Sequence, residues 1–268
     1  MTGVKKSWIA GLLSFERDGD TFTVPEPMGG RGERLFGGMI AAQALGAAGA
    51  TVEADKLPQS LHAYFIRGGK FGVELQFQVE RTRDGRAFDT RRVTALQEGK
   101  AILEMIASFH TPEVGADWHP EPPPALTLQD ALPKDPGLSI TDHLEIRTAV
   151  TDSTPFAVPP YWVRFRDAVA EPGADTALTR ACALTFVTDL GPVPAARPAG
   201  TPLRPDVGFA ASLDHAVWFH RPYEPTAWHR YEVRSVNNSD NRGLVVGSMY
   251  DEAGSLVASM TQEALWRL

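Results

Sequence analysis

The chain has 268 residues, of which 43% are hydrophobic and 22% charged, a composition typical of folded globular proteins. Its formal net charge of −7 argues against a nucleic-acid-binding protein, because contacts to phosphates need an excess of Lys and Arg. A single cysteine, Cys182, excludes an intrachain disulfide and a cysteine-based metal cluster. No stretch approaches the roughly 20 apolar residues that span a bilayer, so we expect no membrane span.

The first predicted element lies close to the N-terminus. Lys5 and Lys6, followed by an apolar run over residues 8–13, resemble the start of a signal peptide. The run is short, however, and charged residues follow it without a small-residue cleavage site. We interpret this run as the first helical turns of a soluble, cytoplasmic protein.

A long helix is predicted over residues 39–48, an alanine-rich run directly after Gly37 and Gly38. Apolar residues surround most of its circumference, which indicates a helix buried on all sides. Alternating patterns then predict four strands, at about residues 60–67, 72–82, 87–97 and 101–110.

A proline-rich stretch follows the fourth strand. Between Pro112 and Pro136, five further prolines stand in a sequence without apolar periodicity. Proline cannot donate a hydrogen bond to a sheet, so we interpret this stretch as a linker. The predicted division is an N-terminal domain over 1–112, a linker over 113–140 and a C-terminal domain over 141–268 that carries the catalytic residues.

The second half shows the same order of elements. Asp175 is expected to cap a helix from Thr176 to about Thr188. Four strands are then predicted, at about residues 211–220, 229–236, 243–250 and 255–266.

Two short matches between the halves favour an internal duplication over chance similarity of two hairpins. His62 aligns with His215 at an offset of 153 residues, and Gly99 aligns with Gly254 at an offset of 155. The segments before these glycines, Gln97–Gly99 and Asp251–Gly254, are expected to form matching hairpin turns. One buried helix wrapped by an antiparallel sheet, present twice in one chain, predicts an α+β protein with a double hotdog fold.

One polar side chain interrupts the apolar face of the last strand. The residues that share this face are Leu256, Ala258, Met260, Gln262 and Ala264. The matching positions of the first half are all apolar. A buried amide without partners costs about 1–3 kcal/mol, so Gln262 is either a satisfied core residue or a functional one.

Two further polar groups could converge on Gln262. Asp189 ends the second helix, where a carboxylate faces the negative end of the helix dipole at a cost of about 0.3–1 kcal/mol. Ser212 begins the following strand. The alternative roles are a solvated helix-end residue and a strand-edge hydroxyl. Together the three side chains contain no strong nucleophile, but they can hold a water molecule and accept its proton.

The sequence contains no motif for a cofactor or a catalytic metal. A nucleophile elbow, a Walker phosphate loop and a zinc-binding helix are all absent, and the seven histidines do not cluster. His215 and His220 are an odd number of positions apart, which places them on opposite faces of one strand and argues against a shared metal. We therefore expect neither a metal nor a cofactor.

Seven segments carry a resemblance to a known family: Arg34–Gly38, Leu61–Phe65, Arg83–Phe88, Arg91–Val93, Ala107–Phe109, Asp214–Pro222 and Val257–Glu263. On these segments the sequence resembles the acyl-CoA thioesterase II family of tandem double-hotdog thioesterases. The likeness covers nearly the whole chain outside the proline-rich stretch. The run Leu190–Pro192 departs from the family pattern, which weakens any inference about acyl-chain preference.

The resemblance implies a catalytic triad of Asp, Ser or Thr, and Gln in the second half. These roles map onto Asp189, Ser212 and Gln262. The implied reaction is hydrolysis of acyl-CoA to a fatty acid and CoA by direct attack of water, with Asp189 as the general base and the other two residues holding the water.

The substrate-binding residues expected from the first half are Gly37, Gly38 and His62. The Gly38 amide, at the start of a helix, is the candidate to stabilise the oxyanion. The phosphates of CoA require basic residues, and the arginine-rich stretch over residues 81–92 is where we expect them. The expected partners are an acyl-CoA substrate and further copies of the chain in a homo-oligomer.

Two other functions remain open. One is a non-catalytic acyl-CoA or lipid-binding protein with the same fold, although the presence of all three catalytic residue types argues against it. The other is a hotdog enoyl-CoA hydratase, which needs a cooperating Asp and His. Asp214 and His215 are adjacent, so their side chains should project from opposite faces of a strand.

Overall fold

The computed structural model of the chain describes residues 7–27, 30–31, 34–123, 126–135, 139–149, 158–168, 174, 176–202 and 208–267. Lys5, Lys6, Asp175 and Pro136 from the sequence analysis lie outside the described residues. No helix in the described part of the chain is long and apolar enough to cross a membrane.

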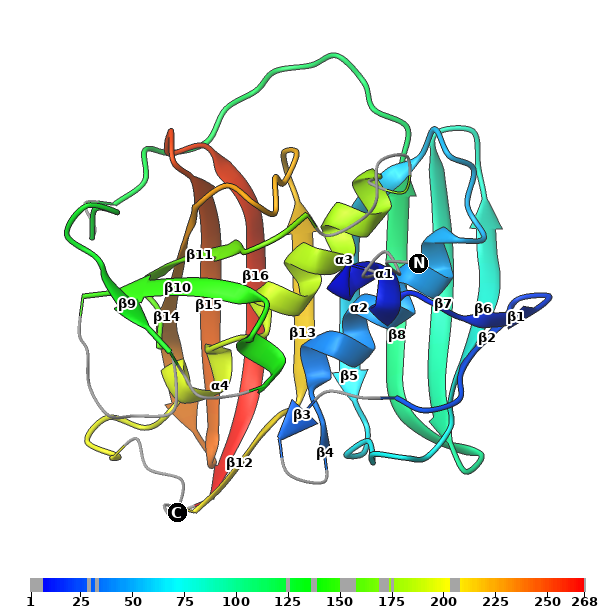
Figure 1. The fold of residues 1–268 in the computed structure, drawn as a ribbon, viewed down its shortest axis with the longest axis horizontal. Coiled ribbons are helices and arrows are strands. Elements are labelled where there is room, and N and C mark those ends of the chain that lie inside the picture. The colour runs from blue at the N-terminus through cyan, green and yellow to red at the C-terminus, as the bar shows by residue number, and fades with distance from the viewer. Residues whose placement is uncertain are drawn as a thin grey trace, which may run out of the picture.

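One antiparallel sheet of 14 described strands runs through both halves of the chain (Figure 1). The strands of the first half are β1 (Glu16–Asp18), β2 (Thr21–Val24), β3 (Gly30–Arg31), β4 (Arg34–Leu35), β5 (Leu57–Phe65), β6 (Leu75–Asp84), β7 (Phe88–Gln97) and β8 (Lys100–His110). Those of the second half are β9 (Leu132–Lys134), β10 (Leu144–Thr148), β11 (Tyr161–Phe165), β12 (Phe209–Ser212), β13 (Asp214–Phe219), β14 (His229–Ser239), β15 (Arg242–Asp251) and β16 (Leu256–Arg267). β3 and β4 form a separate hairpin.

The strand order shows that the two halves meet in the middle of this sheet. The order is β1-β2-β6-β7-β8-β5-β13-β16-β15-β14-β11-β10-β9, and β12 also pairs with β16. From the centre outwards, β5-β8-β7-β6-β2 in one half is matched by β13-β16-β15-β14-β11 in the other. The predicted α+β double hotdog is therefore the observed architecture.

Two long helices lie on one face of the sheet and pack against each other (Figure 1). The helices are α1 (Trp8–Leu12), α2 (Gly37–Gly49), α3 (Ala177–Thr188) and α4 (Pro192–Ala195), with a short 3-10 turn at Ser139–Thr141. Residues 38–48 of α2 are all buried, as its apolar circumference predicted. The N-cap of α3 is Thr176, whose side chain accepts a hydrogen bond from the Thr179 amide.

The long strands confirm the predicted ones to within a few residues, and both predicted hairpin turns are present. Glu98 and Gly99 have φ values of 50° and 70°, which is the left-handed geometry of a two-residue hairpin turn. The structure adds short strands that the sequence analysis missed. Among these, β2 and β11 precede the long helices and pair with β6 and β14.

One strand lies inside the segment interpreted as a linker. β9 pairs with β10, so residues 132–134 belong to the sheet edge. Residues 111–123 form no helix or strand and cross the upper end of the molecule (Figure 1). The domain boundaries, the oligomeric state and the cellular location stay predictions from the sequence.

Strand register corrects the alignment of the two histidines. Ala63 pairs with Met105 and Val217 pairs with Met260, so β13 corresponds to β5 at an offset of 154 residues and β16 to β8 at 155. The counterpart of His215 is therefore Leu61. A slip of one residue moves a side chain to the other face of a strand. Accordingly, His215 is fully buried whereas His62 is exposed.

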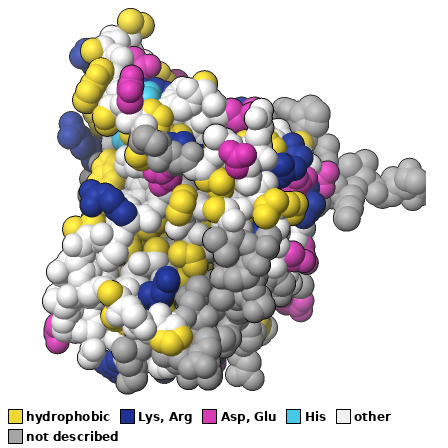
Figure 2. All heavy atoms as spheres, turned by 90° about the vertical axis from the view of Figure 1, so that its left-hand side faces the viewer, with side chains coloured by type: hydrophobic (Ala, Val, Ile, Leu, Met, Phe, Trp, Pro, Cys, Tyr) yellow, Lys and Arg dark blue, Asp and Glu magenta, His cyan; other side chains and the backbone are white. Residues whose placement is uncertain are grey.

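The charge on the surface is mixed. On the side of the molecule that carries the β9–β10 edge, basic and acidic side chains are interspersed (Figure 2). This face therefore offers no segregated basic patch among its described residues.

Candidate active site

The candidate site lies where the end of α3 meets the start of α2. Asp189 is the C-cap of α3 and is 6% exposed. Its Oδ2 accepts a hydrogen bond of 2.6 Å from the Gly38 backbone N–H in the first turn of α2. The carboxylate thus faces the positive end of a second helix dipole, which offsets its unfavourable position on α3.

Two glycines allow this close approach of the helices. A Cβ on Gly38 would lie 2.7 Å from the Asp189 Cβ and 3.0 Å from the Phe186 carbonyl oxygen. A Cβ on Gly37 would lie 3.0 Å from Asp189 Oδ2. The absence of side chains at Gly37 and Gly38 therefore lets the Gly38 amide reach the carboxylate.

Burial gives Asp189 an unusual pKa. Loss of solvent raises the pKa of the carboxyl group from 3.8 to about 7, against the opposing effects of the nearby Gln262 side chain and the Gly38 N–H. Oδ1 is buried and accepts no hydrogen bond of good geometry from any described residue. The carboxylate thus keeps one oxygen available and changes charge near neutral pH, which suits a general base.

The second part of the site is a buried chain of hydrogen bonds behind Asp189. Gln262 is fully buried, and its Nε2 donates to Ser212 Oγ at 2.8 Å. Its Oε1 lies 2.6 Å from His215 Nδ1, and His215 Nε2 lies 3.0 Å from Thr188 Oγ1. The residues predicted from the sequence, Ser212 and Gln262, are thus joined, and the chain extends to two residues that were not predicted.

The protonation of His215 gives this chain a direction. Burial lowers the pKa of His215 to about 4, so its ring is neutral at pH 7 and carries one proton. The Gln262 Oε1 can only accept, which places that proton on Nδ1. Nε2 is then an acceptor 3.0 Å from Thr188 Oγ1, whose single proton also has the Thr185 carbonyl as an acceptor at 3.0 Å. The Gln262 amide is therefore held with its NH₂ group toward Ser212.

Two buried tyrosines hold the backbone on either side of Asp189. The Tyr231 hydroxyl donates to the Thr188 carbonyl at 2.5 Å, and the Tyr161 hydroxyl donates to the Leu190 carbonyl at 2.6 Å. Carbonyls at a helix end have no partner within the helix. β11 and β14 thus supply the bonds that fix the position of the Asp189 backbone.

Asp189 and Ser212 open onto one cavity of about 540 Å³. Its wall is mostly apolar and includes Phe36, Ile40, Phe65, Ile146, Leu190 and Val193. Asp189 is the one acidic residue among the described residues of the wall, while Arg34 and Arg67 supply positive charge. An apolar cavity with a few polar groups is typical of a site for a small amphipathic ligand.

The structure does not bring every predicted residue to this site. His62 lies on the outward face of β5, where its ring packs edge-to-face against Trp218 at 5.0 Å. The geometry gives no support to its predicted substrate-binding role. The Gly38 amide is already bonded to Asp189, so the geometry gives no support to its predicted role in stabilising an oxyanion.

The arginines expected to meet CoA lie elsewhere. Arg81 pairs with Asp20 at 2.8 Å, the buried Arg91 pairs with Asp84 at 2.5 Å, and Arg92 pairs with Glu104 at 3.3 Å. Arg81, Arg91 and Arg92 do not line the cavity, so the prediction for residues 81–92 is not supported. The arginines of the cavity wall belong to β4 and to the segment after β5.

The geometry of Asp214 and His215 bears on the hydratase alternative. The Asp214 carboxylate accepts from the Glu263 backbone N–H at 2.6 Å, whereas the His215 ring lies in the core against Gln262. The two side chains serve different partners, as the strand period predicted. Among the described residues, no group of three His, Cys, Asp or Glu side chains is arranged to hold a metal ion.

Comparison with known proteins assigns the chain to a family. The sequence model of the acyl-CoA thioesterase N-terminal domain matches residues 24–110, and that of the C-terminal domain matches residues 120–266. The chain belongs to the acyl-CoA thioesterase family. It is therefore a thioester hydrolase, as the resemblance of its motifs implied.

Individual acyl-CoA thioesterases are similar to this chain over most of their length. Acyl-coenzyme A thioesterase 8 of Homo sapiens is 32% identical, in a match that covers 88% of this chain and 81% of the relative. Acyl-CoA thioesterase 2 of Haemophilus influenzae is 28% identical and is matched over 96% of both chains. Among solved structures, an acyl-CoA thioesterase II from Mycobacterium marinum has 30% identity and a TM-score of 0.75, with 97% of this chain and 96% of that chain covered.

Proposed function

We propose that this acyl-CoA thioesterase-family member hydrolyses acyl-CoA to a fatty acid and free CoA, with Asp189 as the general base. One observation carries the proposal. The Asp189 carboxylate, with a pKa of about 7 and one unbonded oxygen, shares an apolar cavity with the Ser212 hydroxyl. A base whose pKa lies near the working pH is the most effective at taking a proton from water.

In the proposed mechanism, a water molecule is held between the Asp189 carboxylate and Ser212 Oγ. Asp189 takes a proton from this water as its oxygen attacks the thioester carbonyl carbon. The tetrahedral intermediate then collapses with cleavage of the carbon–sulfur bond. The CoA sulfur leaves with the electron pair and takes the proton back from Asp189, so the base is regenerated without an acyl-enzyme.

Gln262 and His215 act in this proposal as positioning residues. Because Gln262 Nε2 donates to Ser212 Oγ, the Ser212 hydroxyl proton is directed to another acceptor, and the attacking water can be that acceptor. His215 keeps the amide in this orientation through its bond to Oε1. The Gln262 side chain also interacts with Asp189, whose pKa it lowers.

A different amide must stabilise the developing oxyanion, since the Gly38 N–H is engaged. We propose the Gly37 N–H, which lies one residue earlier at the start of α2 in the cavity wall. The N-terminal end of a buried helix favours negative charge, and an amide placed there needs no reorganisation during the reaction.

The test is the release of free thiol from palmitoyl-CoA by the purified protein, followed with a thiol reagent. We expect the substitution Asp189→Asn to lower kcat by about 10²- to 10⁴-fold with little change in KM, because it removes the base but keeps the shape of the side chain.

Asp214→Asn is a suitable control. Asp214 is the first residue of β13, and the one hydrogen bond described for its side chain comes from the Glu263 backbone N–H. A fully active Asp189→Asn protein, or loss of thiol release in Asp214→Asn alone, would contradict the proposed role of Asp189.

A further inference from the structure

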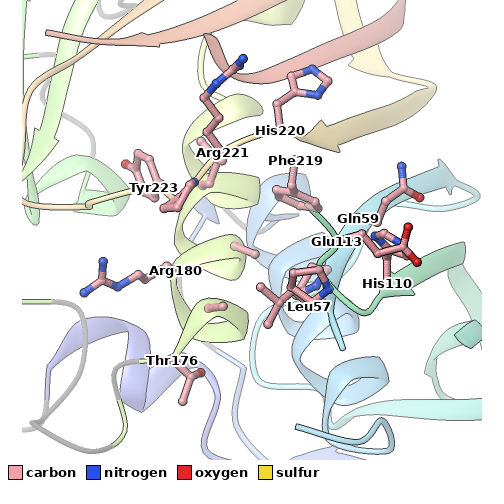
Figure 3. Close-up of a pocket in the computed structure, with 16 residues that line it drawn as sticks. Leu57, Gln59, His110, Glu113, Thr176, Arg180, Phe219, His220, Arg221 and Tyr223 are labelled. Carbon is pink, nitrogen blue, oxygen red and sulfur yellow. The ribbon is translucent and has the colours of Figure 1, made fainter. Parts of the chain in front are cut away.

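A second cavity, of about 620 Å³, lies at the other end of α3 (Figure 3). Its wall is formed by the first turns of α3, the start of β5, the end of β8 and the segment that follows β13. Leu57 and Phe219 lie near its centre, with His110, Glu113 and Gln59 on one side (Figure 3). The proposed mechanism makes no use of this cavity.

The internal symmetry of the chain makes this cavity the counterpart of the first one. The segment after β5, residues 65–69, lines the first cavity, and residues 219–223, at the offset of 154, line the second. In the same way, residues 211–213 line the first cavity and residues 57–59 line the second. The two cavities are thus built from equivalent parts of the two halves.

The helix contacts extend this correspondence to the catalytic aspartate. The N-caps of α2 and α3 are Phe36 and Thr176, so the helices correspond at an offset of 140 residues. At this offset Gly38 corresponds to Leu178, and Gly49 corresponds to Asp189. A Cβ on Gly38 would meet Asp189, and in the equivalent contact a Cβ on Gly49 would meet the Leu178 side chain. Gly49 is therefore the counterpart of Asp189 in the contact between the two helices, and it does not line the second cavity.

The other polar groups of the candidate site, Ser212 in the cavity wall and Gln262 and His215 behind it, are replaced as well. The counterpart of Ser212 is Pro58, that of Gln262 is Ala107 and that of His215 is Leu61. No base, hydroxyl or amide remains at these positions. The second cavity therefore lacks the counterparts of the groups proposed to carry out hydrolysis at the first.

One positive charge is retained at both cavities with the same geometry. Arg67 Nη1 donates to the Ala101 carbonyl at 2.7 Å, and its counterpart Arg221 donates to the Leu256 carbonyl at 2.6 Å. Each arginine lines its own cavity. Ala101 and Leu256 are counterparts as well. The second cavity has thus kept the arginine and the backbone carbonyl that it bonds, although the counterparts of the catalytic groups are absent.

Each of the two arginines of the second cavity pairs with a carboxylate that is exposed to solvent. Arg180 and Arg221 line it together with His110 and His220, and Glu113 is the acidic residue of the described wall. Arg180 pairs with Glu224 at 2.7 Å. Arg221 pairs with Asp117, which belongs to the segment 111–123 without helix or strand and has a side chain 75% exposed.

We propose that this second cavity is a non-catalytic binding site for a long acyl chain with an anionic head group, such as acyl-CoA or the free fatty acid. The apolar wall holds the chain, and Arg221 binds the head group after it displaces Asp117. The inference rests on the proposed function, because it assigns to the second cavity a ligand of the class that the first one hydrolyses.

The experiment is isothermal titration calorimetry of the full chain with a non-hydrolysable thioether analogue of palmitoyl-CoA. We expect two equivalents to bind to the wild-type protein. Ala177→Trp places a large side chain in the second cavity, from an exposed position on the first turn of α3, and should leave one equivalent. Ala211→Trp fills the first cavity beside Ser212 and should also leave one.

Two polar variants test the same site without large side chains. Asp117→Asn should tighten the second equivalent and Arg221→Gln should weaken it by about tenfold, since an ionic hydrogen bond to the head group is lost. Titrations with palmitate and with CoA alone identify the head group: binding of palmitate assigns the site to the fatty acid, and binding of the thioether analogue alone assigns it to acyl-CoA.

The outcomes separate this inference from the proposed function. A wild-type protein that releases thiol from palmitoyl-CoA but binds one equivalent of the thioether analogue, together with an Ala211→Trp protein that binds no palmitate, would overturn the second site only. If Ala177→Trp still binds two equivalents and Arg221→Gln weakens neither of them, the second ligand binds elsewhere. That result would also overturn the second site. Two equivalents that respond to these variants in a protein without thiol release would leave the site standing and overturn the proposed hydrolysis.

Discussion

Asp189 combines two features that usually oppose each other, burial and negative charge. Burial of a carboxylate is unfavourable, and here a single backbone N–H bond of 2.6 Å compensates for part of the lost hydration. The remaining imbalance appears as the raised pKa of about 7. The same environment that destabilises the charge therefore prepares the residue to accept a proton.

The pKa of Asp189 predicts the pH dependence of the reaction. The base must be ionised, so we expect kcat/KM to reach half its maximum near pH 7 and to fall about tenfold for each unit below it. His215, with a pKa of about 4, stays neutral over this range and adds no second transition. Initial rates with palmitoyl-CoA from pH 5 to pH 9 measure this profile, and a flat profile would exclude Asp189 as the base.

His215 offers a test of the hydrogen-bond chain, because the first half of the protein has leucine at the equivalent position. The substitution His215→Leu should fit sterically but leave Gln262 Oε1 without its partner. We expect kcat to fall about 10-fold or more while KM changes little, because the Gln262 amide loses its fixed orientation. An unchanged kcat in a folded His215→Leu protein would show that Gln262 needs no support from His215.

At the scale of elements, the decisive contact is that between the start of α2 and the end of α3. Close packing of two helices requires small residues at the contact, and glycine allows a backbone amide to reach a side chain of the neighbouring helix. The tyrosine hydroxyls of β11 and β14 hold the end of α3 from the other side. Both helices and two strands thus define the position of one carboxylate.

Gly38→Ala tests this contact. The added Cβ would lie 2.7 Å from the Asp189 Cβ and 3.0 Å from a backbone oxygen of α3, so the helices must separate. We expect a loss of about 1–3 kcal/mol in the free energy of unfolding together with a lower kcat. Urea denaturation and thiol release measure the two effects.

Gly46→Ala in the same helix is the matched control. Its Cβ would meet the end of the flexible Leu13 side chain at 2.6 Å, which can move aside. We expect this variant to retain activity, since Gly46 lies two turns further along α2. Equal loss of kcat in both variants would show that the effect comes from the helix in general and not from the contact with Asp189.

At the scale of the whole molecule, the site affects folding stability. A carboxyl group whose pKa is 3.8 when unfolded and about 7 when folded stabilises the protein fully below pH 3.8 and loses that contribution as the pH rises through 7. The loss amounts to about 4 kcal/mol above pH 7. The charged Asp189 is therefore destabilising at the pH where it is catalytically competent.

Asp189→Asn should consequently be more stable than the wild type at pH 8, by up to about 4 kcal/mol, with the difference shrinking toward pH 4. Urea denaturation of both proteins between pH 4 and pH 8 tests this expectation. A wild-type protein that is the more stable one at pH 8 would contradict the burial of an uncompensated charge at this position.

Much of this architecture could be predicted from the sequence because it depends on local patterns. Alternation of apolar and polar residues with a period of two indicates the long strands, and the apolar circumference of residues 39–48 indicates a buried helix. The short strands β1, β2, β9, β10 and β11 have three to five residues, too few for a pattern to stand out. Gln262 could be predicted as a candidate residue because it is the one polar side chain on an otherwise apolar strand face.

The sequence by itself determined the fold class, the repeat and the three polar residues at the candidate site, because strand periodicity, helix composition and family motifs are all carried by neighbouring residues. Only the tertiary structure decided which groups they contact. The Gly38 amide binds Asp189, His215 orients Gln262, and Arg34 and Arg67 line the cavity instead of the arginines of 81–92. Such contacts join residues up to 151 positions apart, and the packing of helices and the register of strands, not local sequence, set their distances.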